Sequence, residues 1–357
     1  MMAECDGPGG AEVVMLQLSE ELRRRGHDIV YLGPDNGEGW LAARYKEAGV
    51  LTATFSQRRP LDPKCLAGMV KTIHDLRVDV VHSHEFFMAI YGTAVTRILR
   101  KRHVLTMHGN QKMTDVWRRR AALRWAFNNS HASVAVSRAT QEQLERDLGV
   151  TPGLLKLIPN GIPVREGNPQ KLRNELGIGD DVVLLLAVGS LIPRKGHITL
   201  LQALKELDDA GFTGKFHLAI AGRGEDRDKL QKFADDSGLG DRFHLLGVRN
   251  DIPDVQAGAD IFVMPSLWEG LPLAVLEAMF AGKAIIATSA SGIPEAITDG
   301  EHGLLIAPGD PGPLAAALKR LIERPDERER LGKAAQARAQ SVFTIQKMTD
   351  GYEPLYL

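Results

Sequence analysis

Short apolar runs rich in β-branched residues alternate with segments of helical spacing along almost the entire chain. Runs without polar alternation predict strands that are buried on both faces, and the amphipathic segments between them predict the helices that cover those faces. This alternation is typical of a doubly wound parallel sheet of the α/β class. The expected strands span residues 28–32, 78–82, 104–107, 132–136, 182–188, 216–221, 261–264 and 284–288, and the expected helices span 13–25, 65–76, 140–148, 198–207 and 313–322.

The length of the chain and one connector predict two domains. A chain of 357 residues exceeds the ~150 residues of a typical single core. Residues 159–163 (Pro-Asn-Gly-Ile-Pro) interrupt the regular pattern as a compact connector. We therefore expect one Rossmann-like domain over residues 1–159 and a second over residues 164–342. Few residues precede the first glycine turn, so the first strand of the first domain is expected to be very short or truncated.

Composition excludes several classes of protein. Hydrophobic residues at 44% and charged residues at 25% exclude disordered and fibrous chains. Cys5 and Cys65 are too few for a disulfide scaffold and lack metal-ligand spacing, which favours a reducing, cytoplasmic compartment. No apolar run approaches the ~20 residues that span a bilayer, and the first residues show no pattern of a secretory signal.

The net charge of −1 conceals an asymmetry between the two halves of the chain. Residues 1–160 hold 22 Lys and Arg against 17 Asp and Glu, whereas the remainder holds 22 against 28. A basic half joined to an acidic half suggests two domains that face different partners. Solvated surface charge without a partner is the alternative.

A glycine-rich turn opens the first predicted helix. Residues 7–12 read Gly-Pro-Gly-Gly-Ala-Glu. Glycines let the backbone approach a ligand closely, and the free N–H groups at a helix start suit a phosphate. Because glycine turns before helices are common, this turn alone is weak evidence for a binding site.

The junction at residues 266–273 (Ser-Leu-Trp-Glu-Gly-Leu-Pro-Leu) carries a sharper signal. Glu269 lies in the turn at the carboxyl edge of the predicted sheet, where ligands of open α/β sheets bind, and Glu277 lies about two helical turns further on. These carboxylates can accept hydrogen bonds from the hydroxyls of a sugar and a ribose. The N–H groups of Gly270, Leu271 and Leu273 can meet phosphate oxygens.

The run over residues 266–309 resembles the signature of the family 4 retaining glycosyltransferases. These have the GT-B fold, in which two Rossmann-like domains face each other across a cleft. Further motifs in the family's order extend the resemblance over nearly the whole chain. They are GPGGAE at 7–12, Thr-x-His-Gly at 106–109, Val-Ser at 136–137, PNGI at 159–162, VGSLIPRKGH at 188–197, AGRG at 221–224 and LGVRNDI at 246–252.

The resemblance implies that the second domain binds a nucleotide-diphosphate sugar. Glu269 would hold the donor sugar and steady charge near its anomeric carbon, while Glu277 would accept the ribose hydroxyls. Lys195, with Arg194 beside it, would neutralise the departing diphosphate, as fixed cations stabilise leaving-group charge in general. The loops that would flank the nucleotide base contain Gly222, Arg223, Val248 and Arg249.

The resemblance also implies that the first domain binds the acceptor and that residues 343–357 pack back on it. Gly9 and Gly10 would close over the diphosphate of the donor. His108 would reach the donor sugar and the reacting centre, and a structural histidine is the alternative for this residue.

The chain departs from the family at Ser190, where relatives often have an arginine, so we hypothesise that Arg194 and Lys195 together form the cationic clamp. The motif Asp226-x-Asp228 starts a predicted surface helix, and neither a metal ion nor a cofactor is expected.

Because no residue is an obvious covalent nucleophile, the retention implied by the family favours attack on the same face through an oxocarbenium-like state.

Four other histidines are expected to have less specific roles than His108. His82 and His84 end a predicted strand as His-Ser-His. A pair of metal ligands is one interpretation. A polar pair that lines the acceptor cleft or is merely solvated is the favoured one. His197 and His302 are expected to be structural.

A basic stretch of the first half interleaves arginine with tryptophan at helical spacing. This pattern suits an anionic membrane surface or a lipid-linked acceptor, and a solvated helix face is the alternative. Nucleic acid is not an expected partner, because no aromatic platform or known binding motif accompanies the charge. The members are Arg97, Arg100, Lys101, Arg102, Lys112, Arg118, Arg119, Arg120 and Arg124, with Trp117 and Trp125.

Together these features predict a retaining, metal-independent hexosyltransferase. It would move a sugar from a nucleotide-diphosphate sugar to a glycan or lipid-linked acceptor, as in bacterial polysaccharide, lipopolysaccharide or glycolipid biosynthesis. A cytoplasmic location with peripheral contact to the inner face of the membrane is expected.

Two alternatives come from other functional classes. A nucleotide-sugar 2-epimerase shares the architecture, but the spacing of Glu269 and Glu277 around the EGLP sequence argues against it. A non-catalytic sugar-nucleotide binder is suggested by Ser190 and the short first strand. An NAD oxidoreductase is disfavoured, because no complete G-x-G-x-x-G follows a strand with an acidic residue ~20 positions on.

Overall fold

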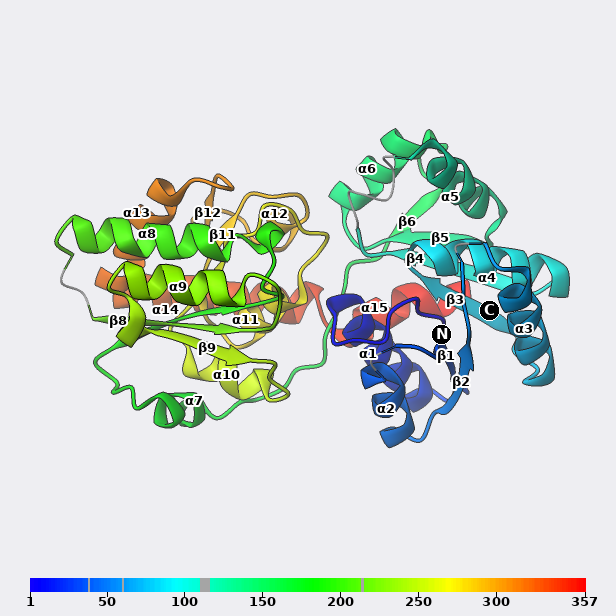
Figure 1. Cartoon of the computed structure of the whole chain (residues 1–357), viewed down its shortest axis with the longest axis horizontal. Helices are drawn as coiled ribbons and strands as arrows, with labels where there is room; N and C mark the ends of the chain where they lie inside the picture. The colour runs from blue at the N-terminus through cyan, green and yellow to red at the C-terminus, as the bar shows by residue number, and fades with distance from the viewer. Residues whose placement is uncertain (38, 60, 110–115, 213–214) are drawn as a thin grey trace. The chain divides into compact units, whose positions relative to one another are not determined.

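The computed structural model describes residues 1–37, 39–59, 61–109, 116–212 and 215–357. These residues form two compact units (Figure 1). The first unit comprises Met1–Pro163 and Thr344–Leu357, and the second comprises Val164–Phe343. Each unit is built on parallel strands covered by helices, which confirms the predicted α/β class with two Rossmann-like domains.

In the first unit, β3 to β6 form a parallel sheet in chain order, and β1 pairs with β2. The strands are β1 (Val30–Pro34), β2 (Leu51–Phe55), β3 (Val80–His84), β4 (Arg102–Met107), β5 (Ala132–Ala135) and β6 (Leu155–Leu157). The helices are α1 (Gly10–Arg24), α2 (Trp40–Glu47), α3 (Pro63–Asp75), α4 (Phe86–Leu99), α5 (Trp117–Asn129), α6 (Arg138–Leu148) and α15 (Ile345–Tyr352), followed by the 3₁₀ turn η4 (Glu353–Leu355).

Residues 1–3 connect these two groups of strands. Met2 forms isolated parallel bridges to Leu32 in β1 and to Ser83 in β3. The His84 N–H donates to the Met2 carbonyl at 3.0 Å, and Met2 is buried. Three residues therefore hold the central position of the sheet, where the first strand was expected.

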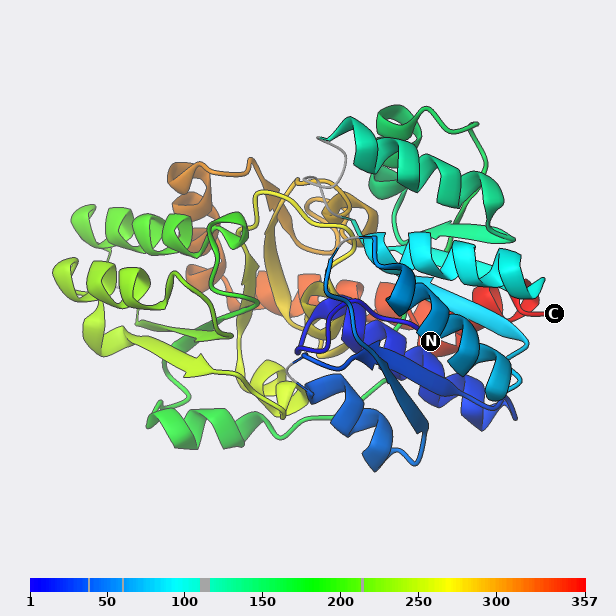
Figure 2. The same ribbon diagram turned by 45° about the vertical axis from the view of Figure 1, so that its right-hand side comes forward.

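The last helix returns to the first unit. α15 lies beside α1 in both views (Figures 1 and 2). The Arg25 guanidinium, just after α1, donates to Asp350 at 2.7 Å and to Glu353 at 2.8 Å. The Ile345 N–H also donates to the carbonyl of Ile162 at 3.0 Å. Ion pairs and backbone hydrogen bonds thus fix the C-terminal segment to the first unit.

The second unit contains one parallel sheet in the order β12-β11-β10-β7-β8-β9. The strands are β7 (Val183–Val188), β8 (Phe216–Ala221), β9 (Phe243–Gly247), β10 (Ile261–Met264), β11 (Ala284–Thr288) and β12 (Leu304–Ile306). The helices are α7 (Pro169–Leu176), α8 (His197–Asp209), α9 (Arg227–Asp236), α10 (Ile252–Gly258), α11 (Leu273–Phe280), α12 (Ile293–Ala296), α13 (Pro311–Glu323) and α14 (Pro325–Val342), with the 3₁₀ turns η2 (Pro193–Lys195) and η3 (Gly240–Arg242).

The order of these strands locates a ligand-binding edge. Chain order runs outward from β7 to β9 on one side and from β10 to β12 on the other. The direction reverses between β7 and β10, and ligands of open α/β sheets bind outside the carboxyl ends of the strands at such a point. Leu184, Leu185 and Leu186 in β7 are fully buried, as expected for a central strand covered on both faces.

Among the described residues, the strands β2, β6, β9 and β12 lie outside the predicted set. Each is at an edge of its sheet and is only partly buried along its length. An edge strand needs no continuous apolar run, so hydrophobic pattern alone does not reveal it.

Two helical glycines differ in what a side chain would meet. A Cβ at Gly332 in α14 would lie 2.1 Å from the carbonyl oxygen of Gly282. A Cβ at Gly68, which is exposed in α3, would meet no atom within 4 Å. The packing of α14 therefore requires glycine at 332, while α3 does not require it at 68.

We expect Gly332→Ala to lower the free energy of unfolding of the second unit and Gly68→Ala to raise that of the first. Alanine gains about 1 kcal/mol over glycine inside a helix, but at 332 the backbone must move apart, which costs about 1–3 kcal/mol or more. Urea denaturation followed by circular dichroism measures both variants. Equal stability of the two variants would contradict the close approach at Gly332.

Candidate functional site

Close backbone contacts assemble the loops at the carboxyl edge of the second sheet. A Cβ at Gly222, after β8, would lie 1.9 Å from the carbonyl oxygen of Gly189, after β7. A Cβ at Gly196, between the η2 turn and α8, would lie 2.0 Å from the carbonyl oxygen of Pro265, after β10. Glycine is needed where backbones approach this closely. The loop after β7 is therefore held against the loops that follow β8 and β10.

Lys195 and Glu269 form a buried ion pair at this edge. Nζ of Lys195 lies 2.6 Å from Oε1 of Glu269, and the two side chains are 14% and 7% exposed. The Ser266 hydroxyl donates to the same carboxylate oxygen at 2.7 Å. The Thr288 hydroxyl in turn donates to the Ser266 carbonyl at 2.5 Å. The structure thus brings together two of the three side chains predicted to be catalytic.

Arg194 belongs to the same cluster. Its Nη1 donates to the carbonyl oxygen of Trp268 at 3.0 Å and lies 3.7 Å from Oε2 of Glu269. Its guanidinium carbon also lies over the Trp268 ring, 5.6 Å from the centroid. The Arg194 side chain is 43% exposed. Both cations of the predicted clamp therefore converge on Glu269, and Arg194 remains accessible to solvent.

Glu277 lies on α11, which begins at Leu273 directly after this loop. Burial raises the pKa of Glu277 to about 7, and the charge of Arg165 opposes that shift. Among the described residues, no side chain forms a hydrogen bond or an ion pair with the Glu277 carboxyl. An unpaired carboxyl in the second turn of α11 is thus available to a ligand hydroxyl.

The other predicted donor-binding residues differ in accessibility. Ser190 and Arg223 are exposed, Gly222 is half-buried, and Val248 is 47% exposed. Gly270, Leu271 and Leu273 are buried at the start of α11. Arg249 is 16% exposed and paired with Glu175 at 2.7 Å and Asp251 at 2.8 Å, which raises its pKa. The guanidinium of Arg249 is therefore held in place by two carboxylates of its own unit.

The glycine turn of the first unit is lined by carboxyl groups. Gly9 precedes α1, and a Cβ there would lie 2.2 Å from Oε2 of Glu12. A Cβ at Gly10 would meet no atom within 4 Å. Burial, reinforced by the charges of Glu4 and Asp6, raises the pKa of Glu12 to about 6. This turn is open to a ligand, but its surroundings oppose the approach of an anion.

His108, the third residue predicted to be catalytic, follows β4 in the first unit and contacts His84 at the end of β3. Nε2 of His108 lies 3.0 Å from Nδ1 of His84, and the two rings are stacked. Burial lowers the pKa of His108 to about 4 and the pKa of His84 well below its usual value. Both rings are therefore neutral at pH 7. The backbone N–H of His108 donates to Oε1 of Glu85 at 3.2 Å.

His82 links this region to the C-terminal segment. Its Nε2 lies 2.8 Å from the Thr106 hydroxyl, which lies 3.0 Å from the hydroxyl of Tyr352. The Tyr356 hydroxyl lies 2.9 Å from Nδ1 of His82. His82 and His84 are 2% and 3% exposed. Their interpretation as solvated residues is wrong, because the first sheet and the returning C-terminal segment bury them.

No group of three or more His, Cys, Asp or Glu side chains among the described residues could hold a metal ion. Asp226 directly precedes α9, and Asp228 lies in the first turn of that helix. Cys5 is exposed and Cys65 is buried, and the described residues form no disulfide bond with either.

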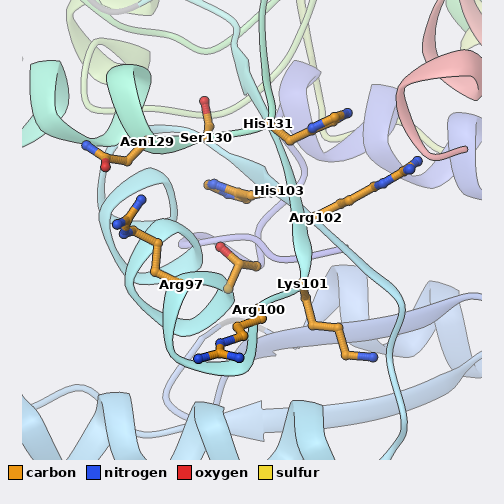
Figure 3. Close-up of a pocket in the computed structure, with 9 residues that line it drawn as sticks. Arg97, Arg100, Lys101, Arg102, His103, Asn129, Ser130 and His131 are labelled. Carbon is orange, nitrogen blue, oxygen red and sulfur yellow. The ribbon is translucent and has the colours of Figure 1, made fainter.

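A basic pocket of about 500 Å³ lies at the amino end of β4 (Figure 3). Figure 3 shows the side chains of Arg97, Arg100 and Lys101 pointing in different directions around it. β4 runs from Arg102 at this pocket to Met107, the residue before His108. The pocket and His108 are therefore at opposite ends of one strand. The charged and imidazole side chains around the pocket are Arg97, Arg100, Lys101, Arg102, His103 and His131.

The rest of the basic stretch lies on α5. Trp117 is 66% exposed and Trp125 is 40% exposed. Lys112 lies outside the described residues. Across the described ranges, no helix is both long and apolar enough to pass through a bilayer. The exposed arginines of α5 are Arg118, Arg119, Arg120 and Arg124.

Sequence reasoning missed two parts of these sites. Ser266 was not predicted to contact Glu269, although its polar side chain three residues before the glutamate was a usable signal. Glu85 was not singled out, and the contact between its carboxyl and His108 joins residues 23 positions apart. Periodicity and motif spacing carry no information about such a contact.

Two family models match almost the whole chain. The model described as Glycosyltransferase Family 4 matches residues 8–166, and the model described as Glycosyl transferases group 1 matches residues 168–338.

Two curated relatives are similar over nearly their full length. The chain is 30% identical to the MMP alpha-(1->4)-mannosyltransferase of Mycolicibacterium hassiacum, over 95% of this chain and 92% of that protein. It is 28% identical to the UDP-Gal:alpha-D-GlcNAc-diphosphoundecaprenol alpha-1,3-galactosyltransferase of Escherichia coli, over 98% of this chain and 93% of that protein.

Solved structures show the same fold. Anabaena HepE (Alr3699), crystallised with UDP-glucose, matches with a TM-score of 0.86 at 24% identity, over 99% of this chain and 98% of that one. The sucrose-phosphate synthase of Thermosynechococcus elongatus matches with a TM-score of 0.83 at 20% identity, over 99% and 97%. Sequence and fold together show that this chain belongs to glycosyltransferase family 4, the glycosyl transferases group 1.

Proposed function

We propose that this family 4 glycosyltransferase is a retaining hexosyltransferase that uses a nucleotide-diphosphate sugar. The observation that carries the proposal is the buried Lys195–Glu269 pair, together with the unpaired carboxyl of Glu277 on the helix that follows Glu269 in the chain. A nucleotide sugar has the three features that these groups would recognise, namely a diphosphate, a hexose and a ribose. All of these side chains follow the strands at the carboxyl edge of a Rossmann-like sheet, where such ligands bind.

The ion pair supplies the charges that the reaction needs. A bound diphosphate would offer Lys195 and Arg194 a new anionic partner in place of Glu269. The two cations would then stabilise the negative charge that builds on the leaving phosphate as its bond to C1 breaks. In this scheme side chains provide the positive charge, so the transfer requires no metal ion.

The freed carboxylate of Glu269 would accept hydrogen bonds from hexose hydroxyls and stabilise positive charge at C1. The acceptor oxygen then bonds to C1 on the face from which the diphosphate departs. The electron pair of the broken bond stays on the diphosphate, and the acceptor proton passes to the departing oxygen. Retention follows because both bonds lie on the same face.

His108 would contact the transferred sugar as a neutral ring, since its lowered pKa keeps it uncharged at pH 7. The second unit would bind the donor and the first unit the acceptor. Gly9 and Gly10 would approach the donor through their backbone, which the open space beside Gly10 permits.

The relatives' names support a uridine-diphosphate hexose and a lipid-linked or glycan acceptor. The Escherichia coli relative is named for UDP-Gal and a GlcNAc-diphosphoundecaprenol acceptor, and the Anabaena structure holds UDP-glucose. A role in bacterial cell-surface polysaccharide, lipopolysaccharide or glycolipid biosynthesis fits both.

Contact of the first unit with the anionic inner face of a membrane fits the surface of α5. Exposed tryptophans suit the headgroup region, and arginines beside them suit anionic lipids. A lipid-linked acceptor would be reached from such a position.

The double variant Arg194→Ala, Lys195→Ala is expected to raise the dissociation constant of UDP at least about 30-fold, because two charged hydrogen-bond donors to the diphosphate are lost. Isothermal calorimetry with UDP measures the change. Lys205→Ala removes a solvent-accessible lysine of α8 that pairs with Asp209, and this variant should bind UDP like the parent. Comparable affinity of the double variant and the parent would refute the clamp.

UDP affinity is expected to fall as the pH drops below about 7, by up to tenfold per unit. The raised pKa of Glu277 leaves its carboxyl protonated below that pH, and the ionised form is the better acceptor for ribose hydroxyls. Calorimetry from pH 5.5 to 8.5 tests this prediction. The Glu277→Gln variant is the control, because its pH profile reflects only the titration of UDP and of the other groups of the protein. Identical pH profiles for parent and Glu277→Gln would exclude Glu277 as the titrating residue.

The protein is expected to co-sediment with phosphatidylglycerol vesicles at low salt and to be released at about 0.5 M salt. Arg118→Gln, Arg119→Gln, Arg120→Gln should weaken this binding. The triple variant Lys205→Gln, Lys215→Gln, Lys232→Gln removes the same charge from exposed lysines of the second unit and should bind like the parent. Equal binding by both triple variants would remove α5 as the membrane surface.

A further inference from the structure

Glu85 has a backbone conformation that residues with side chains seldom adopt. It lies between β3 and α4 with φ 68° and ψ −175°. This region of backbone space is essentially confined to glycine, because a Cβ is crowded there. Such a conformation raises the energy of the folded state and persists only where neighbouring contacts impose it.

The backbone contacts of Glu85 do not require a side chain. Its N–H donates to the carbonyl of Thr106 at 3.2 Å, and its carbonyl accepts the N–H of Ala89, in the first turn of α4, at 3.0 Å. Glycine would make both hydrogen bonds without strain. The presence of glutamate at this position therefore needs an explanation in its carboxyl group.

The carboxyl of Glu85 has spare hydrogen-bonding capacity. Oε1 accepts the backbone N–H of His108, and no other described residue makes a hydrogen bond or an ion pair with this carboxyl. Burial, and to a smaller extent the charges of Glu4 and Glu12, raise the pKa of Glu85 to about 8. The hydrogen bond from the His108 N–H opposes this shift, because it favours the ionised carboxylate. At pH 7 the group is therefore a neutral acid, which can both donate and accept a hydrogen bond, as a sugar hydroxyl can.

The ring of His108 is oriented by the ring of His84. Nε2 of His84 is buried without a partner. A buried nitrogen lone pair is less costly to leave unpaired than a buried N–H. The proton of His84 is therefore on Nδ1 and is donated to Nε2 of His108. This arrangement leaves the proton of His108 on Nδ1, where no described residue accepts it.

We propose that the carboxyl of Glu85, which accepts the backbone N–H of His108, binds a hydroxyl group of a sugar substrate, and that the strained backbone at Glu85 is retained for this purpose. The proposal rests on the proposed glycosyltransferase function and adds a second recognition group from the first unit. Both sugars of the reaction carry hydroxyls, so the source is decided by experiment.

The test compares Glu85→Gly, Glu85→Gln and Arg77→Gly with the parent. Arg77 also has a positive φ, 51°, and lies after α3, so its replacement by glycine controls for the backbone change. Melting temperature, UDP affinity, UDP release from UDP-glucose and UDP-galactose, and transfer to an N-acetylglucosaminyl diphosphoryl lipid are measured for each protein.

Glu85→Gly is expected to melt within about 2 °C of the parent or above it, because relief of strain offsets the lost carboxyl. It should bind UDP like the parent but turn over sugar substrate at least tenfold more slowly. Glu85→Gln keeps a neutral group that donates and accepts, and should stay within about threefold of the parent. Arg77→Gly should match the parent in turnover.

Loss of UDP release without acceptor would assign the hydroxyl to the donor sugar, and loss confined to transfer would assign it to the acceptor. A Glu85→Gly protein that melts well below the parent, or that retains full turnover in both assays, overturns the proposal. A parent protein that binds neither UDP nor UDP-sugars would instead refute the proposed function.

Discussion

The buried pair of Lys195 and Glu269 is the interaction on which the second unit's site depends. Removing two charges from water is costly, and a buried ion pair seldom contributes much net stability. Here the two charges neutralise each other in the loops that follow β7 and β10, where the proposed function needs both of them. The geometry of the pair is set by the backbone, because Gly196 follows the lysine directly and its Cα packs against Pro265, close to Ser266 and Glu269. An anion that enters this edge meets a lysine already placed and already desolvated.

In the first unit, hydrogen bonds rather than an ion pair satisfy buried polar side chains of the site. His82, Thr106 and Tyr352 form a hydrogen-bonded chain that joins β3 and β4 to the returning C-terminal helix. Satisfied networks of this kind favour one arrangement of the core, since an unpaired member would be costly. His84 rests on this chain through its ring contact with His82, at 4.2 Å between centroids, and holds His108. The orientation of His108 thus depends on residues more than 240 positions away in sequence.

Burial explains which strands the sequence predicts and which strands it does not predict. The central strands were predicted because burial on both faces imposes a continuous apolar run, as in β7 and β10. The segments β2 and β12 were missed, because an edge strand is only partly covered. The predicted first strands began two residues early, at 28 and 78 rather than Val30 and Val80, since hydrophobic pattern does not mark where hydrogen bonding begins.

The same distinction applies to the candidate site, where the sequence predicts some features and not others. Glu269, Glu277 and Lys195 lie in short contiguous motifs, so the sequence could name them, and the structure places Lys195 and Glu269 in contact. The strain at Glu85 and the proton position on His108 arise from contacts between β3 and β4, which no local pattern encodes.

The sequence contains two helix starts that could bind a phosphate, and the charges around them differ. At α1 the raised pKa of Glu12, to about 6, shows that the group already lies among carboxyls and in poor contact with water. A diphosphate at this turn would add negative charge where Glu12, Glu4 and Asp6 already repel one another. At η2 and α11 the cations Arg194 and Lys195 converge on a single carboxylate, so an added anion would be attracted. These charges therefore favour the second unit as the place for the proposed diphosphate, and the glycines at the start of α1 are better suited to approach a neutral part of the substrate.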